Sequence, residues 1–119
     1  METLREVLFY KDYFTIFFDS LSHQVKNKID EVLFMLTIIE RIPSKFFKHV
    51  DGIKGLYEIR VEYSSNIYRI FCCFDNGNLV ILFNGLQKKT QKTPKKELEK
   101  AERIMKEYFH EQKDNGRKK

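Results

Sequence analysis

The sequence contains few of the residues that characterise disordered, collagen-like or disulfide-stabilised chains. Its 119 residues include two prolines, five glycines and two cysteines. Such low proline and glycine contents argue against a disordered or collagen-like chain. Cys72 and Cys73 are adjacent in an apolar segment, so they point to opposite faces of a strand, and neither has a distant partner for a stabilising disulfide. We expect two reduced thiols and a cytoplasmic location.

The sequence also lacks the motifs of several enzyme classes. His23, His49 and His110 are scattered and do not have the spacing of zinc ligands. There is no phosphate-binding glycine loop, no nucleophile elbow and no paired-carboxylate motif. Glu2 and Arg5 lie close to the N-terminus and no uninterrupted apolar segment follows them, so we expect neither a signal peptide nor a membrane span.

The hydrophobic content of the chain is sufficient for one core, and its positive charge is unevenly distributed along the sequence. Hydrophobic residues make up 42% of the chain and aromatic residues 14%, which is enough for a single domain over residues 1–119 but not for two. The net charge is +5, and residues 1–87 hold 10 basic and 11 acidic side chains whereas residues 88–119 hold 12 and 6. This basic C-terminal quarter suggests nucleic acid, an acidic protein or a membrane surface as partner. No aromatic-rich amphipathic basic helix favours the membrane.

Hydrophobic periodicity predicts a small α+β domain with the element order β-α-α-β-β-β-α. A period near 3.6 indicates two consecutive amphipathic helices that form an N-terminal antiparallel hairpin, and a period of two indicates strands joined by tight turns. We expect the small, mainly antiparallel sheet to pack on this hairpin. Ser20 or Ser22 is expected to cap the second helix, which ends at Ile42-Pro43. The predicted elements are a strand over 6–10, helices over 13–21 and about 22–42, a connecting segment over 43–55 with room for one helical turn, strands over 57–62, 68–74 and 79–83, a helix over about 94–112 and a disordered tail over about 113–119.

A lysine-rich arm follows the last predicted strand. The chain is expected to turn at Asn84-Gly85, and Thr93-Pro94 is expected to begin the last helix, with the threonine as its N-cap. Five lysines lie in this stretch, before the first acidic residue at Glu97: Lys88, Lys89, Lys92, Lys95 and Lys96. Their mutual repulsion would be relieved by a polyanionic partner. The alternative is a solvated, lysine-rich connector.

Two arginines come from neighbouring predicted strands. If the apolar sides of these strands lie on the helical hairpin, Arg60 and Arg69 lie on the open, opposite face of the sheet. Guanidinium groups on rigid strands can hold a phosphate and stabilise the extra charge of a transition state. The alternative is that Arg60 pairs with Glu58, Glu62 or Asp75 as ordinary charge on the sheet surface.

The element order and three motifs together resemble the RelE/ParE superfamily, the toxins of type II toxin–antitoxin modules. The motifs are GLYEIRVE at 55–62, YRIF at 68–71 and LFNGLQKKTQKTP at 82–94. The resemblance extends from Val7 to about Phe109, and within the superfamily the chain looks most like the HigB-like branch, also known as phage-derived toxins. It implies a RelE-like fold for this single domain.

The resemblance implies that the chain is a ribosome-dependent mRNA endoribonuclease, which inhibits translation in the cytoplasm. In such toxins a ribose 2′-hydroxyl attacks the adjacent phosphate, and neither a metal nor another cofactor is needed. The implied partners are the ribosome with its mRNA and a cognate helix-turn-helix antitoxin, through which the toxin would reach operator DNA. Two alternatives are a ParE-like, non-enzymatic inhibitor of DNA gyrase and a degenerate member that only binds an antitoxin or nucleic acid.

The same resemblance assigns roles to individual residues. Arg60 and Arg69 match arginines of family members on these strands and would hold the scissile phosphate. Lys89 and His49 are further catalytic candidates, the lysine because it matches the lysine motif of the family. The residues expected to bind RNA are Lys45, Lys48, Lys88, Lys92, Lys95 and Asn84.

The proton acceptor and donor stay open at this point. Many relatives carry a histidine where this chain has Asn84 and an aromatic residue where it has Leu86. An asparagine can orient a hydroxyl or a phosphate but cannot take a proton. A lysine of lowered pKa, His49, Tyr57 or Tyr68 would have to supply this group. Strand alternation places the two tyrosines on the buried side, where they would be core residues.

Overall fold

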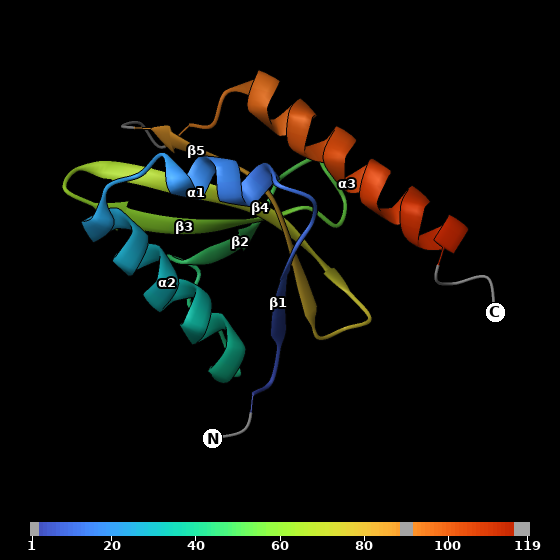
Figure 1. Cartoon of the computed structure of the whole chain (residues 1–119), viewed down its shortest axis with the longest axis horizontal. Coiled ribbons are helices and arrows are strands. Elements are labelled where there is room, and N and C mark those ends of the chain that lie inside the picture. The colour runs from blue at the N-terminus through green and yellow to red at the C-terminus, as the bar shows by residue number, and fades with distance from the viewer. Residues whose placement is uncertain (1–2, 89–91, 116–119) are drawn as a thin grey trace.

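The chain forms a five-stranded sheet with helices on both faces (Figure 1). A computed structural model describes residues 3–88 and 92–115 and gives the element order β1-α1-α2-β2-β3-β4-β5-α3. The strands are β1 (Glu6–Phe9), β2 (Phe47–His49), β3 (Tyr57–Tyr63), β4 (Asn66–Asp75) and β5 (Leu79–Lys88), and the helices are α1 (Tyr13–Asp19), α2 (His23–Ile38) and α3 (Lys95–Asn115). None of the helices in this part of the chain has the length and apolar character that a membrane crossing requires.

The strands are ordered β1-β5-β4-β3-β2 across the sheet. β1 is parallel to β5, and all other neighbours are antiparallel. Two tight hairpins join the central strands, as expected. Ser64 and Ser65 have φ values of 51° and 68° between β3 and β4, and Asn76 and Gly77 have 52° and 79° between β4 and β5. Left-handed dihedrals at both residues suit the twist of the two-residue turn between β3 and β4. The connection between β4 and β5 has three residues, from Asn76 to Asn78.

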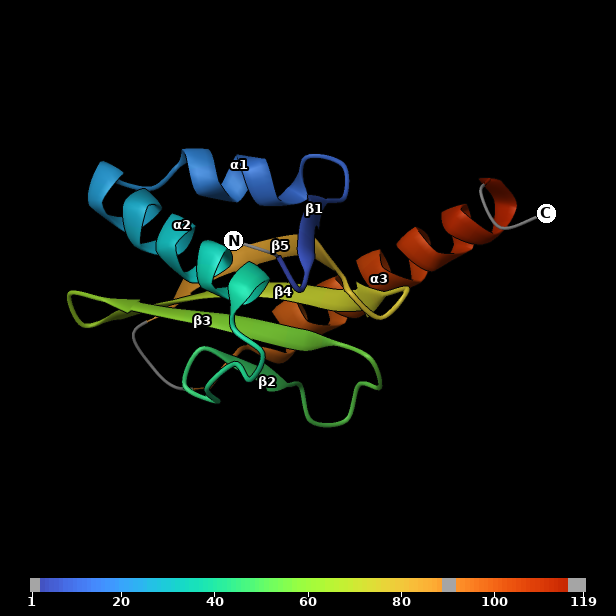
Figure 2. The same ribbon diagram turned by 90° about the horizontal axis from the view of Figure 1, so that it is seen from below.

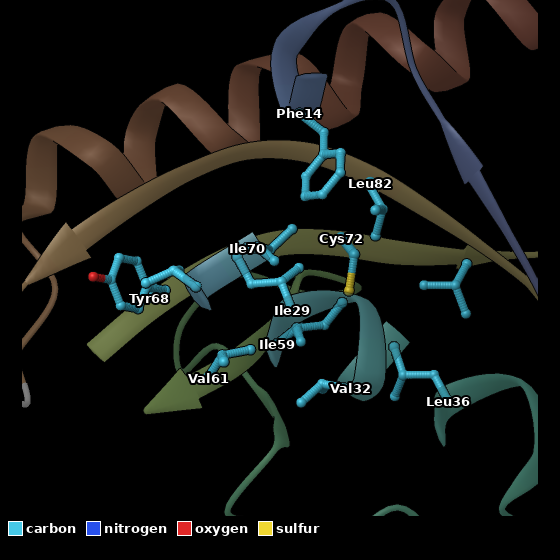
Figure 3. Close-up of a cluster of buried hydrophobic side chains, with 12 residues drawn as sticks. Phe14, Ile29, Val32, Leu36, Ile59, Val61, Tyr68, Ile70, Cys72 and Leu82 are labelled. Carbon is cyan, nitrogen blue, oxygen red and sulfur yellow. The ribbon is translucent and has the colours of Figure 1, made fainter. Parts of the chain in front are cut away.

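α1 and α2 cover one face of the sheet, which we call the hairpin face (Figure 2). Four residues of α2 recur at helical spacing and are buried: Val25, Ile29, Val32 and Leu36. They pack on the inward side chains of β3, β4 and β5, which include Ile59, Val61, Tyr68, Ile70, Cys72 and Leu82 (Figure 3). Ser22 caps α2, because its Oγ accepts the Val25 N–H at 3.4 Å. The predicted hairpin and its packing on the sheet are confirmed.

α3 covers the opposite face, which we call the α3 face. Its buried residues are Ala101, Ile104, Met105 and Tyr108, and they pack with Phe71, Cys73, Ile81 and Phe83 of the sheet. The Tyr108 hydroxyl donates a hydrogen bond of 2.7 Å to the buried carboxylate of Asp75. Cys72 and Cys73 therefore belong to different faces, as the alternation predicted, and both are free thiols.

The predicted α+β class is confirmed, with one strand more than expected. Residues 47–49 form β2, which pairs with β3 from Ile59 to Tyr57, whereas the sequence suggested a connecting segment with room for one helical turn. A strand of only three residues is too short for an alternation of apolar and polar side chains to be recognised in the sequence. The strand exists because β3 offers it an edge.

Three element boundaries differ from the predictions by three residues or more. α2 ends at Ile38, with extended dihedrals at Ile39, so the expected end at Ile42-Pro43 was wrong. β5 continues to Lys88, and Asn84-Gly85 is not a turn. At that point the register with β4 shifts, so that two residues of β5 oppose one of β4, which is a β-bulge. α3 continues to Asn115.

Candidate functional site

The sheet register places the two predicted arginines directly opposite each other. Arg60 of β3 pairs with Arg69 of β4. Arg69 alternates with Phe71 and Cys73, which pack under α3, so both arginines lie on the α3 face. Glu58, two residues before Arg60, lies on the same face. The strands thus bring two guanidinium groups and one carboxylate together.

Glu58 holds both arginines. Its Oε2 lies 2.6 Å from Nη1 of Arg69 and 3.3 Å from Nε of Arg60. The Glu58 residue is 4% exposed and Arg69 is 2% exposed, so water screens their attraction weakly. We call these three residues the Arg–Glu cluster. The expectation that Arg60 and Arg69 lie on an open face was wrong, because α3 covers that face. The alternative is confirmed in its Arg60–Glu58 pair but not in its surface position, because both side chains are largely buried.

A pocket of about 310 Å³ opens beside the Arg–Glu cluster. We call it the cluster pocket. Glu58 and Arg69 line it from the sheet, Lys48 from β2, and Lys92 and Leu98 from the segment that leads into and begins α3. Lys48 pairs with Glu58 across the strands and therefore shares its face. This geometry brings together one predicted catalytic residue, Arg69, and two predicted RNA-binding residues, Lys48 and Lys92.

The other predicted lysines lie elsewhere or outside the described residues. Lys45 lines a second pocket together with Arg60. Lys88 ends β5 opposite Ile67, and Lys95 is the exposed first residue of α3. Lys89 lies outside the residues that the structure describes. The structure therefore gives Lys45 and Arg60 a common site and leaves the roles of Lys88, Lys89 and Lys95 as predictions.

His49 and the two candidate tyrosines do not reach the cluster pocket. His49 pairs with Tyr57, and their rings contact edge to face at 5.2 Å on the hairpin face. The Tyr57 ring also stacks on the Phe47 ring, with 5.1 Å between the ring centroids. Tyr68 is 5% exposed within the core under α2. The predicted placement of both tyrosines on the buried side is confirmed, and His49 is on the opposite face from Glu58 and Arg69.

Asn84 lies in the bulge of β5 and is buried. Both its amide nitrogen and its amide oxygen are fully buried, and neither has a hydrogen-bond partner among the described residues. A buried polar group without a partner costs on the order of 1–3 kcal/mol.

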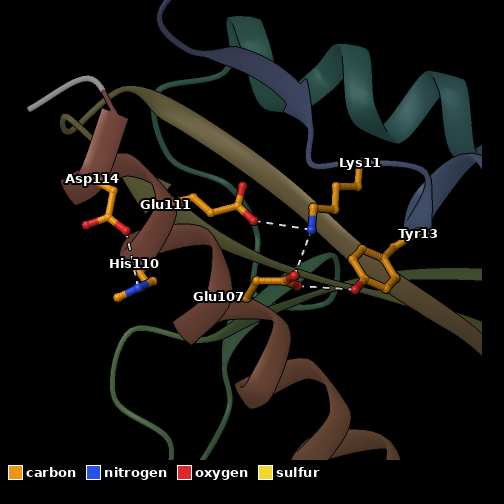
Figure 4. A network of polar contacts seen from close by, with 6 residues as sticks. All are labelled: Lys11, Tyr13, Glu107, His110, Glu111 and Asp114. Atoms are coloured by element: carbon orange, nitrogen blue, oxygen red, sulfur yellow. Dashed lines mark hydrogen bonds and ion pairs between the residues drawn. The ribbon is translucent and has the colours of Figure 1, made fainter.

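A separate polar network fastens the C-terminal half of α3 to the start of the chain (Figure 4). Lys11 Nζ lies 2.7 Å from Glu107 and 3.2 Å from Glu111, and the Tyr13 hydroxyl lies 3.2 Å from Glu107. The hydrogen bonds to these carboxylates raise the pKa of Lys11. Burial, together with Glu111 and Glu107, raises the pKa of Tyr10 to about 12. The network holds the end of α3 that lies away from the cluster pocket.

Glu58 is the residue of this site that the sequence did not indicate as functional. It was considered only as a charge partner of Arg60. A signal was present, because Glu58 and Arg60 share one strand face and Arg69 was expected opposite them. In the described residues no group of three or more histidine, cysteine, aspartate or glutamate side chains is placed to hold a metal ion.

Comparison with known proteins identifies the family. The family model described as "Phage derived protein Gp49-like (DUF891)" matches residues 16–106, which is most of the chain. Among solved structures, the chain is similar to one chain of the archaeal RelE–RelB complex from Pyrococcus horikoshii OT3, with 14% identity and a TM-score of 0.54. The match covers 75% of this chain and 99% of the other. No curated protein matches the sequence. The fold is RelE-like, and the chain belongs to the Gp49-like family of phage-derived proteins.

Proposed function

We propose that this toxin is a ribosome-dependent endoribonuclease that cleaves mRNA at the Arg–Glu cluster and so inhibits translation. The observation that supports this most directly is the cluster pocket. It places the guanidinium of Arg69 and the carboxylate of Glu58 in one concave site with two exposed lysines, Lys48 and Lys92. A site with this composition suits a polyanion with a reacting phosphate.

The proposed chemistry is attack of a ribose 2′-hydroxyl on the adjacent phosphorus. The 2′-oxygen forms a bond to phosphorus and the bond from phosphorus to the 5′-oxygen of the next nucleotide breaks. The products are a cyclic phosphate and a 5′-hydroxyl, whose proton comes from water. Arg60 and Arg69 stabilise the extra negative charge of the transition state. Asp51 and Glu58 are the carboxylates that line this pocket, and Glu58, which contacts both arginines, takes the proton of the attacking hydroxyl. No step of this scheme needs a metal ion.

Lys48 and Lys92 bind the RNA backbone in this scheme. Both side chains are exposed, whereas Arg69 contacts the pocket only by a small part of its surface. The side chain of Arg60 is 15% exposed and is the more accessible of the two guanidinium groups. The phosphate enters between the lysines and reaches Arg69 from the pocket side, and Arg60 lies beyond Glu58, outside the lining of this pocket.

The proposed inhibitor is a cognate antitoxin with a helix-turn-helix region. The relative from Pyrococcus horikoshii is described as part of a RelE–RelB complex, and this similarity of fold supports a protein partner of that kind here. The toxin would reach operator DNA only through this antitoxin.

The test is inducible expression in the absence of an antitoxin, with growth followed and the 5′ ends of transcripts mapped. The first variant is Arg60→Ala, because Arg60 is the accessible arginine and its removal leaves the buried Arg69–Glu58 pair in place. The second is Lys48→Ala/Lys92→Ala, with Lys100→Ala/Lys106→Ala on the exposed side of α3 as matched control. Circular dichroism confirms that each variant is folded.

We expect growth arrest with new in-frame cuts in translated messages. Cleavage should fall by about 100-fold or more in Arg60→Ala, the size typical for loss of one donor to a transition-state oxyanion. The lysine pair should weaken cleavage and its control should not. Arrest with intact messages and damaged DNA would favour inhibition of gyrase instead, and no arrest would favour a protein that only binds its antitoxin.

A further inference from the structure

A second pocket is lined by Arg60 and shares no lining residue with the cluster pocket. It has a volume of about 250 Å³ and lies between α2, the segment before β2, and β3. β2 pairs with β3 as far as Ile59, and the Arg60 N–H donates a hydrogen bond of 2.8 Å to the Phe46 carbonyl, so the edge of β3 beyond Arg60 is left to this pocket. We call it the α2–β3 pocket.

Three cations surround the α2–β3 pocket. They are Lys28 of α2, Lys45 of the segment before β2, and Arg60 of β3, and the one acidic residue that lines it is Glu62. Lys28 also lies 4.0 Å from Glu31, but both of these side chains are well exposed, so this contact binds the lysine weakly. The pocket therefore carries an excess of positive charge and suits an anionic ligand.

The wall of the pocket is apolar and aromatic. Val32 and Val61 are buried, and Phe46 is partly buried beside them. The ammonium group of Lys45 lies 5.0 Å from the centroid of the Phe46 ring, within the range of a cation–π contact. Aromatic rings beside cations are the combination with which proteins bind single-stranded nucleic acid, the ring for a base and the cation for a phosphate.

We propose that the α2–β3 pocket binds one nucleotide of single-stranded RNA, next to the nucleotide whose phosphate reacts at the Arg–Glu cluster. This inference rests on the proposed function. Arg60 connects the two sites, because it lines this pocket while its Nε contacts Glu58, which lines the cluster pocket. A strand of RNA that crosses Arg60 would place neighbouring nucleotides on either side of it.

The size and the lining favour a nucleotide over other anions. Pockets for small-molecule ligands commonly measure about 300–1,000 Å³, so a pocket of about 250 Å³ suits a single base rather than a larger ligand. Free phosphate or an acidic side chain would use the cations alone and make no use of the partly buried ring of Phe46. A base with its phosphate uses both parts of the lining.

The test measures binding of a short RNA oligonucleotide with 2′-O-methyl groups, which the proposed reaction cannot cleave. The variant is Lys28→Glu, and the matched control is Lys26→Glu. Lys26 lies on the same helix but contacts the ring of Phe18 and does not line the pocket. Methyl resonances of Val32 and Val61 in the wild-type chain report occupation of the pocket.

We expect the oligonucleotide to shift the methyl resonances of Val32 and Val61. Lys28→Glu should weaken binding by about tenfold, and Lys26→Glu should weaken it by less than about threefold, since a change of charge outside the pocket acts only through the general field of the protein. Equal weakening by both variants, or unshifted valine methyl groups, would overturn the proposal. So would equal shifts with inorganic phosphate alone, because they would indicate an anion site without a place for a base.

The outcomes separate this inference from the proposed function. If the wild-type chain cleaves no message but binds the oligonucleotide in a manner that depends on Lys28, the pocket is supported and the endoribonuclease is not. If Arg60→Ala abolishes message cleavage while Lys28→Glu leaves oligonucleotide binding unchanged, the endoribonuclease is supported and the α2–β3 pocket is refuted.

Discussion

Arg60 and Arg69 face each other across β3 and β4, and one carboxylate oxygen of Glu58 lies within 3.3 Å of both side chains. Like charges directly opposite each other on neighbouring strands are destabilising. Here the carboxylate offsets the repulsion at close range, in a place where water is largely excluded. Glu58 therefore has a structural role whether or not it also takes a proton in catalysis.

Replacement of Glu58 by alanine should destabilise the fold strongly. The variant leaves two guanidinium groups without their carboxylate, and removal of one partner from a buried ion pair costs roughly 3–5 kcal/mol. The measurement is the urea midpoint, which should fall without a change in the slope of the unfolding curve. Glu102→Ala removes a carboxylate from a surface pair with Lys106 and should change stability by less than about 0.5 kcal/mol. Equal effects of the two variants would contradict the prediction.

Gly85 should tolerate no side chain while Phe17 is present. A Cβ at Gly85 would lie 2.5 Å from the ring of Phe17, and overpacking of this kind costs roughly 1–3 kcal/mol. We therefore expect Gly85→Ala to lower the unfolding free energy in the wild-type chain and to lower it much less in a Phe17→Leu background. Denaturation of the four proteins of this double-mutant cycle measures the coupling. Strict additivity would show that α1 does not constrain β5 at this position.

The two cysteines should be unreactive in the native protein. Burial raises the pKa of Cys72 well above its ordinary value and that of Cys73 to about 12, and the thiolate is the reactive form. A thiol reagent such as DTNB at pH 8 should modify neither residue on the timescale on which it modifies the urea-unfolded chain. Rapid modification of one thiol without unfolding would show that one face of the sheet opens locally.

Stability should fall at alkaline pH through Tyr10. Its pKa is about 12 in the folded chain, above the ordinary value of 10.0. The folded state therefore holds the phenolic proton more tightly than the unfolded state does. The contribution of Tyr10 to the free energy of unfolding is complete below pH 10 and is lost as the pH rises from 10 to 12. In urea denaturation across this pH interval, the free energy of unfolding should depend less steeply on pH for Tyr10→Phe than for the wild-type chain. Parallel curves would refute the assignment to Tyr10.

The sequence was sufficient to predict those helices and strands that are long enough to show a clear hydrophobic periodicity. The apolar residues of α2 from Val25 to Leu36 predict the helix and the face that it buries, because four of them recur over three turns. The alternation in β3 and β4 likewise predicts which side Tyr68 and Cys72 occupy. In both cases a local pattern carries the information.

The remaining features depend on neighbours that the sequence does not specify locally. Asn84-Gly85 has the composition of a turn, but β4 is ten residues long and offers pairing as far as Ile67, so β5 continues past the bulge. The burial of Arg69 depends on where α3 lies, and the apolar stripe of α3 fits more than one position on the sheet. For the same reason the cluster pocket, which needs both β2 and the start of α3, could not be predicted from either element alone.

The order of the elements also sets a sequence of events during synthesis. α1 and α2 are synthesised before β3, β4 and β5. When these strands emerge, the helices that pack on their hairpin face are therefore already present. On the other face the cover comes last, and Phe71, Ile81 and Phe83 have no helix to pack under until residues 101–108 have been added. The nascent chain thus passes through an interval in which one side of its sheet is apolar and uncovered. In that interval the exposed apolar surface is prone to aggregation, and α3 has not yet enclosed Arg69, on which the proposed activity depends.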